Sequence, residues 1–163
     1  MRRRGRPRSI LVLLVLAWLA VGAAAQAKLS DAVIAAFRGK IVLSRAAVAP
    51  GPSDKETIAK LKAAQLTELA GTPTDDGQSW TFHYTAFLKK TGNGGLRLQF
   101  VSGEADRRFA TETPIPITDE ESDVLTGELT IGESRGLVRG KAYLLKLVND
   151  KGDVVAKTSA IFK

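Results

Sequence analysis

The sequence predicts a mainly β protein: a single antiparallel β-sandwich of about seven strands, with one amphipathic helix inserted after the first strand. Three observations support this fold class. From Gly39 onward, apolar and polar residues alternate with a period of two, as they do in strands that bury one face. Turn-forming residues separate the alternating runs at intervals of roughly 8–12 residues. Residues 53–69 instead have the apolar spacing of a helix. A small β-barrel is the alternative architecture.

The clearest strand covers residues 79–89. Its inward face is expected to carry Trp80, Phe82, Tyr84, Ala86 and Leu88. Further strands are expected at 41–44, 96–100, 109–117, 125–131, 137–148 and 154–162. Pro114 and Pro116 lack a backbone N–H, so 109–117 is expected at a sheet edge, whereas the largely apolar 137–148 is expected in the centre. Hairpin turns are expected at 91–95 and 132–136, and a further turn at 149–153.

The predicted helix begins at Ser53, and Glu56 follows at the spacing of a capping box. Its apolar face is expected to consist of Ile58, Leu61, Leu66 and Leu69. Gly71 and Pro73 supply the stop signal. Such a helix could cover an open end or one face of the sheet. Residues 31–37 are expected to form one further helical turn.

In number and length the predicted strands resemble an immunoglobulin-like sandwich with a helical insert. The chain has no cysteine, so the cysteine pair of antibody domains is missing and no disulfide can stabilise the fold. Residues 28–163 suit one domain with one core. Stability must therefore come from packing and from the hydrogen-bond ladder.

The first 27 residues have the organisation of a cleaved secretory signal peptide. Five arginines in the first eight positions are followed by an uncharged apolar run at 10–22. Ala25 and Ala27 place small side chains at the two positions that a signal peptidase recognises. The alternative is an uncleaved anchor, but the apolar run is shorter than the roughly 20 residues that span a bilayer. The protein is therefore expected to work outside the cytoplasm, in the periplasm or as a secreted protein.

The net charge of the whole chain is +7, from 24 basic and 17 acidic residues. Five of the basic residues belong to the signal segment, so residues 28–163 carry 19 basic residues against 17 acidic ones, interspersed along the sequence. A nucleic-acid-binding domain needs a concentrated basic stripe. Nucleic acid is therefore not expected as a partner.

One motif resembles a catalytic signature. Residues 132–136, Gly-Glu-Ser-Arg-Gly, match the nucleophile elbow of serine hydrolases, in which a helix follows the serine. Here a strand pattern follows, so a hairpin turn is expected instead. The single histidine, His83, precedes the serine and is expected on the outward face of its strand. Without cysteine or a second histidine, a transition-metal site is not expected either.

Carboxylates could bind calcium, which prefers oxygen ligands. The acidic run at 119–123 is the stronger candidate, although its spacing matches no calcium-loop signature, and the turn that holds Asp150 and Asp153 is the weaker one. A weak calcium-binding module is thus one alternative function.

A carboxylate-only hydrolase, similar to a glycosidase, is the rival class. It would need two acids across a cleft, and the pairs considered are Glu104 with Asp106 and Glu120 with Asp123. Sugar-binding modules also use exposed aromatic platforms, but Trp80 and Tyr84 are expected in the core.

The favoured expectation is an exported, monomeric, non-catalytic binding or structural domain of the cell envelope, with no cofactor and with a protein or an envelope glycan as partner. If the partner is a polypeptide, the proline-free last strand, 154–162, is the expected site of strand addition, with Lys157 in its middle.

We predict cleavage after Ala27. Amino-terminal sequencing of the exported protein should read Lys28, Leu29, Ser30 and Asp31. An exported species that still contains Trp18 would show that the segment is an anchor.

Overall fold

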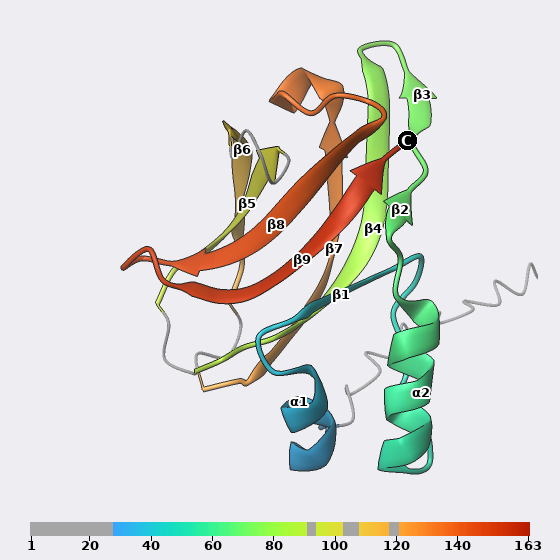
Figure 1. Ribbon diagram of the computed structural model, residues 1–163, viewed down its shortest axis with the longest axis vertical. Helices are drawn as coiled ribbons and strands as arrows, with labels where there is room; N and C mark the ends of the chain where they lie inside the picture. Colours follow the sequence, from blue (N-terminus) through green and yellow to red (C-terminus); the bar gives the residue numbers. More distant parts are fainter. Residues whose placement is uncertain (1–27, 91–93, 103–107, 118–120) are drawn as a thin grey trace, which may run out of the picture.

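The computed structural model describes residues 28–90, 94–102, 108–117 and 121–163, and these residues form a two-sheet β-sandwich (Figure 1). The predicted mainly β fold is confirmed, and the two sheets are not closed into a barrel. In chain order the elements are α1 (Asp31–Phe37), β1 (Ile41–Ser44), α2 (Asp54–Ala64), β2 (Glu68–Leu69), β3 (Thr72–Thr74), β4 (Gly77–Phe87), β5 (Leu96–Ser102), β6 (Arg108–Ile115), β7 (Val124–Gly132), the 3-10 turn η1 (Glu133–Arg135), β8 (Lys141–Asn149) and β9 (Val154–Phe162).

The long strand β4 organises the four-stranded sheet. It pairs with β7 along one side, and with β1 and β3 at opposite ends of its other side. The five-stranded sheet has the order β2-β9-β8-β5-β6. All pairings are antiparallel except the short one between β2 and β9. Strand β8 lies in the interior of its sheet and β6 at an edge, as the sequence predicts.

Two predicted hairpin turns connect different sheets instead. Residues 91–95 lead from β4 in one sheet to β5 in the other, and 132–136 lead from β7 to β8 in the same way. Turn composition shows that the chain reverses but carries no information about which sheet the next strand joins. The 149–153 turn does form a hairpin, between β8 and β9.

The core between the sheets centres on aromatic rings. Phe162 of β9 makes edge-on contacts with four other rings, at centroid separations of 5.3–6.4 Å. These rings belong to Trp80 and Phe82 of β4, Phe100 of β5 and Tyr143 of β8. Because edge-on pairs add to the energy of burial, this cluster joins both sheets without a disulfide.

A second, smaller cluster lies where the two helices cover one end of the four-stranded sheet (Figure 1). Phe37 of α1 stacks on Phe87 of β4 at 5.0 Å, and Leu61 of α2 is buried beside them. The predicted turn at 31–37 is thus a two-turn helix, capped by Ser30. No helix in the described ranges is long and apolar enough to cross a membrane.

Helix α2 begins as predicted but ends earlier. The Ser53 side chain accepts a hydrogen bond from the Glu56 N–H at 3.3 Å. The helix stops at Ala64 rather than at residue 69. Leu66 and Leu69 pack against the core between the sheets instead of extending the helical stripe. Pairing of β2 with the last strand outweighs the helical spacing of these leucines.

Strand β9 is not the open edge that the sequence suggests. Its Lys157 N–H donates to the Gly39 carbonyl, and its Val155 carbonyl accepts from the Lys89 N–H. Further along, the Ile161 N–H donates to the Thr67 carbonyl. Strand addition at 154–162 is therefore excluded, because segments distant in sequence already occupy that edge.

We predict unequal effects of two helix substitutions. Leu61→Ala should lower the free energy of unfolding by about 2–5 kcal/mol, because it removes buried methyl groups. Ser53→Ala should cost about 0.5–2 kcal/mol through loss of the cap. Urea denaturation measures both, with the exposed Lys60→Ala as the control. Negligible effects from both substitutions would contradict the packing described here.

Candidate functional site

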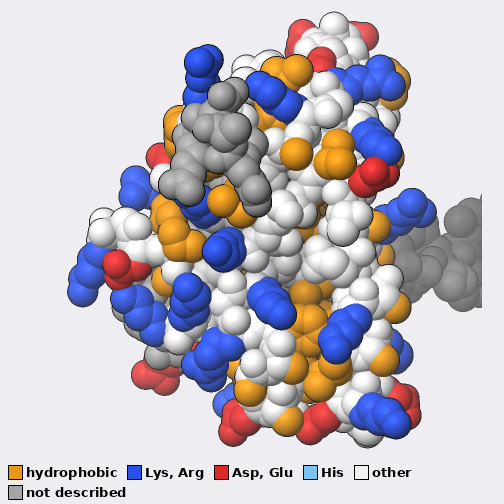
Figure 2. All heavy atoms as spheres, viewed as in Figure 1, with side chains coloured by type: hydrophobic (Ala, Val, Ile, Leu, Met, Phe, Trp, Pro, Cys, Tyr) orange, Lys and Arg blue, Asp and Glu red, His pale blue; other side chains and the backbone are white. Residues whose placement is uncertain are grey.

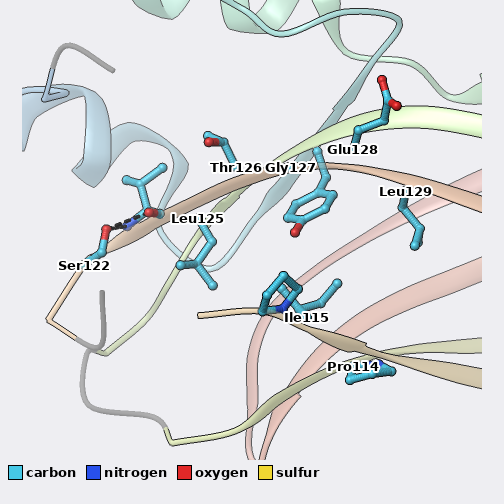
Figure 3. A pocket seen from close by; sticks show the side chains of 11 residues that line it. Pro114, Ile115, Ser122, Leu125, Thr126, Gly127, Glu128 and Leu129 are labelled. Atoms are coloured by element: carbon cyan, nitrogen blue, oxygen red, sulfur yellow. Dashed lines mark hydrogen bonds between the residues drawn. The ribbon is translucent and has the colours of Figure 1, made fainter. Parts of the chain in front are cut away.

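A groove lies where the edges of the two sheets face each other, between β6 and β7. Its volume is about 420 Å³. The walls and floor, here called the β6–β7 groove, consist of Tyr84, Pro114, Ile115, Pro116, Ser122 and residues 124–129. Figure 3 shows Leu125 and Leu129 of β7 on one side and Ile115 of β6 on the other. Six successive residues of one strand contribute, so the groove is elongated along β7.

Strand β7 turns one side of its backbone toward this groove, and at the beginning of the strand Ser122 Oγ bonds to both the N–H and the carbonyl of Val124. Among the described residues β7 pairs only with β4. The Leu88 N–H donates to the Asp123 carbonyl. Because every second residue of an antiparallel strand bonds to its neighbour, this bond fixes which residues of β7 bond to β4. The odd-numbered residues from Leu125 to Ile131 therefore form backbone hydrogen bonds with β4. The backbone N–H and carbonyl groups of Glu128 and Thr130 point away from β4. The backbone groups of Glu128 and Thr130 have no hydrogen-bond partner among the described residues on that side, and this short stretch of edge can accept another strand.

The side chain of Tyr84 lies over Gly127 at the floor of the groove. A Cβ atom at Gly127 would lie 2.5 Å from the Tyr84 hydroxyl oxygen, so only glycine leaves room for the ring. Tyr84 is 6% exposed, and its hydroxyl has no hydrogen-bond partner among the described residues. Burial raises the pKa of this hydroxyl above its ordinary value of 10.0. The hydroxyl can therefore act as a neutral donor or acceptor for a group placed in the groove.

Charge is sparse in the groove. Among the described residues that line it, Glu128 is the one charged residue, and its carboxylate binds His83 Nε2 at 2.8 Å (Figure 3 shows Glu128 pointing away from the gap). His83 lies on the outward face of β4, as predicted. The groove thus combines apolar side chains with backbone and hydroxyl groups, and the Tyr84 hydroxyl lies on its floor.

The hydrolase-like motif is confirmed as a turn. Ser134 lies in the 3-10 turn η1, and the following residues lead into β8 rather than into a helix. Glu133 accepts a hydrogen bond from the Gln78 N–H, which fastens the turn to β4. His83 is engaged with Glu128 instead of Ser134. Ser134 is therefore part of the connection between the two sheets.

The acids of the 149–153 turn are structural acceptors. Asp153 accepts from Lys90 Nζ at 2.6 Å and from Asn149 Nδ2 at 3.2 Å, and Asp150 accepts from the Gly95 N–H at 2.8 Å. The hydrogen bonds from Lys90 and Asn149 hold the pKa of Asp153 below its usual range. These carboxylates tie the β8–β9 turn to the chain that precedes β5.

Several predicted positions lie outside the described residues. They are the cleavage-site residues Ala25 and Ala27, the acids Glu104 and Asp106, and Asp119 and Glu120 of the acidic run. Asp123 is described, and its carbonyl belongs to the ladder with β4. Within the described ranges, no group of three or more His, Cys, Asp or Glu side chains could hold a metal ion.

The groove itself was not found from the sequence. Trp80 and Tyr84 were expected in the core, and both are buried, but Tyr84 also lines the groove. One local signal was present: Gly127 interrupts the leucines of an apolar strand face, and such a glycine often marks the close approach of another group.

No model of a known protein family matches this chain, and no curated protein matches it in sequence.

We predict that Tyr84 titrates above the ordinary tyrosine range. In a pH titration, the difference in ultraviolet absorbance between the wild type and Tyr84→Phe isolates the ionisation of the Tyr84 hydroxyl. Because the unfolded chain ionises first, wild-type stability should fall as pH rises above 10, and Tyr84→Phe should show less of this fall. An isolated Tyr84 transition at or below pH 10 would contradict the buried position.

Proposed function

We propose that this chain is an exported, non-catalytic binding domain of the cell envelope, and that it takes up an extended polypeptide segment in the β6–β7 groove. The bound segment adds as a strand to the open side of β7. The observation that carries the proposal is the outward-facing backbone of Glu128 and Thr130 in β7, beside a groove of mixed apolar and polar lining with the Tyr84 hydroxyl on its floor. Export outside the cytoplasm rests on the signal-like first 27 residues.

The shape of the groove favours an extended chain. Six consecutive residues of β7 line it, which corresponds to a length of roughly 20 Å in a strand. A strand paired with β7 would point alternate side chains between Leu129 and Ile115. The opposite wall contains Pro114, which has no N–H, so the guest strand would pair with β7 alone. Backbone pairing then supplies affinity, and the apolar side chains of Leu125, Leu129 and Ile115 select the side chains of the bound segment.

The Tyr84 hydroxyl adds a polar requirement. The Tyr84 hydroxyl has no hydrogen-bond partner among the described residues, and a hydrogen bond formed there would contribute about 0.5–1.5 kcal/mol. A guest that places a carbonyl or hydroxyl oxygen over Gly127 would satisfy the Tyr84 hydroxyl. The expected guest segment therefore alternates apolar residues with one polar position near its middle.

A photo-crosslinking residue in place of Thr130 tests the proposal in cells that export the chain. Glu128→Pro removes a backbone N–H that points away from β4, so the ladder with β4 is retained. We expect a defined crosslinked polypeptide whose yield falls about tenfold in Glu128→Pro, the equivalent of one hydrogen bond.

Glu128→Gln is the matched control. It removes the charge that pairs with His83 but keeps the backbone N–H, so crosslinking should match the wild type. Thermal unfolding of each variant confirms that it folds. Crosslinking at full yield in a folded Glu128→Pro variant, or no adduct from this edge at all, would falsify strand addition at β7.

A further inference from the structure

Three lysines from separate segments form a row across the outer face of the five-stranded sheet. Lys146 of β8 lies directly opposite Lys157 of β9, and Lys157 is bridged in turn to Lys40 before β1. Residues paired in this way point to the same face, and neighbouring strands lie about 4.8 Å apart. Figure 2 shows Lys and Arg side chains gathered over this face, with acidic groups toward its margins.

The row borders a hollow between the sheet and the helices. The hollow has a volume of about 310 Å³, and Lys40, Lys62 and Lys157 all line it. Thr158 and Gln65 contribute polar groups, and none of the described residues in the lining is acidic. Three lysines from three distant parts of the chain thus meet at one concave surface, and Lys146 lies beside Lys157 on the adjacent strand.

These lysines have no acidic partner among the described residues. The ion pairs of the described chain involve His83, Lys90, Arg97 and Lys163 instead. Like charges directly opposite each other in a sheet destabilise it. An anion seated between Lys146 and Lys157 would offset the unfavourable pairing of these two like charges.

We infer that this lysine row binds a ligand that carries several linked phosphate groups. Lysine binds phosphate as a compact point charge with three donors. A row of three ammonium groups at strand spacing engages more than one phosphate at once, so a linked phosphate chain should bind more tightly than a single phosphate. The inference is independent of the β6–β7 groove, because it uses different strands and a different face.

Calorimetry and thermal unfolding with inorganic tripolyphosphate test the inference on the purified exported chain, in a buffer without phosphate. The wild type should bind tripolyphosphate and gain thermal stability from it. The double variant Lys146→Gln/Lys157→Gln should bind at least about tenfold more weakly, given the size of a charge contact near a protein surface. Without ligand the double variant should unfold at a higher temperature, because the repulsion is gone.

The control variant Lys55→Gln/Lys151→Gln loses the same charge from exposed positions away from the hollow, and it should bind as the wild type does. Orthophosphate should bind more weakly than tripolyphosphate. Vesicles of phosphatidylglycerol, compared with phosphatidylcholine, distinguish a lipid headgroup from a soluble phosphate polymer. Row-dependent binding of tripolyphosphate supports the inference, whereas row-dependent binding of the phosphatidylglycerol vesicles alone would overturn it. Equal affinity of the row and control variants, equal affinity for orthophosphate, or no binding in either arm would overturn it.

Discussion

The packing of Phe162 between the two sheets is the interaction on which the rest of the structure depends. Its ring belongs to the last strand, yet it contacts two rings of β4 and one ring each of β5 and β8. A domain without cysteine has no covalent tie between its sheets, so apolar contact must hold them together. Burial of five aromatic side chains around one point supplies that tie, because each removes a large apolar area from water.

The same end of β9 also closes one side of the sandwich. The Lys163 carbonyl accepts from both Trp80 Nε1 and the Gly71 N–H. These bonds join β4 of one sheet to β9 of the other and hold the segment that contains β2 and β3 beside them. On the opposite side, β6 and β7 do not pair, and Arg135 in the turn after β7 donates to the Glu112 carbonyl of β6 at 3.3 Å. The β6–β7 groove lies on this side, where the two strands are not joined by a hydrogen-bond ladder.

The two proposed binding surfaces differ in chemistry because they arise from different features of the fold. The groove combines the outward-facing backbone of Glu128 with apolar side chains, and the Glu128 carboxylate bonds to His83. The lysine row lies on the outer face of the other sheet, where strand pairing places Lys146, Lys157 and Lys40 side by side without acidic partners among the described residues. A polypeptide strand and a phosphate chain could thus be bound at the same time.

Local sequence determined the elements themselves. Alternation at 79–89 predicted both the long strand and its buried face, because side chains of a strand alternate whatever it pairs with. The Ser53 cap predicted where α2 begins, because capping involves neighbours within one turn. The spacing of nearby residues predicted the wrong element where pairing with a distant strand determined the structure. Leu66 and Leu69 fit a helix, but pairing with β9 ended the helix at Ala64.

Only the tertiary structure decided how the elements were joined and which surfaces resulted. Turn residues at 91–95 and 132–136 predicted reversals, but the sheet that each next strand entered depended on partners far along the chain. The sequence predicts an open edge at β9, but Gly39, Thr67 and Lys89 cover that strand, and the open edge lies at β7 instead. The lysines of the row are interspersed with acids along the sequence, and pairing of strands brings them together. Periodicity and capping act between near neighbours and can be read from the sequence, whereas strand order, edges and charge clusters depend on contacts between distant residues.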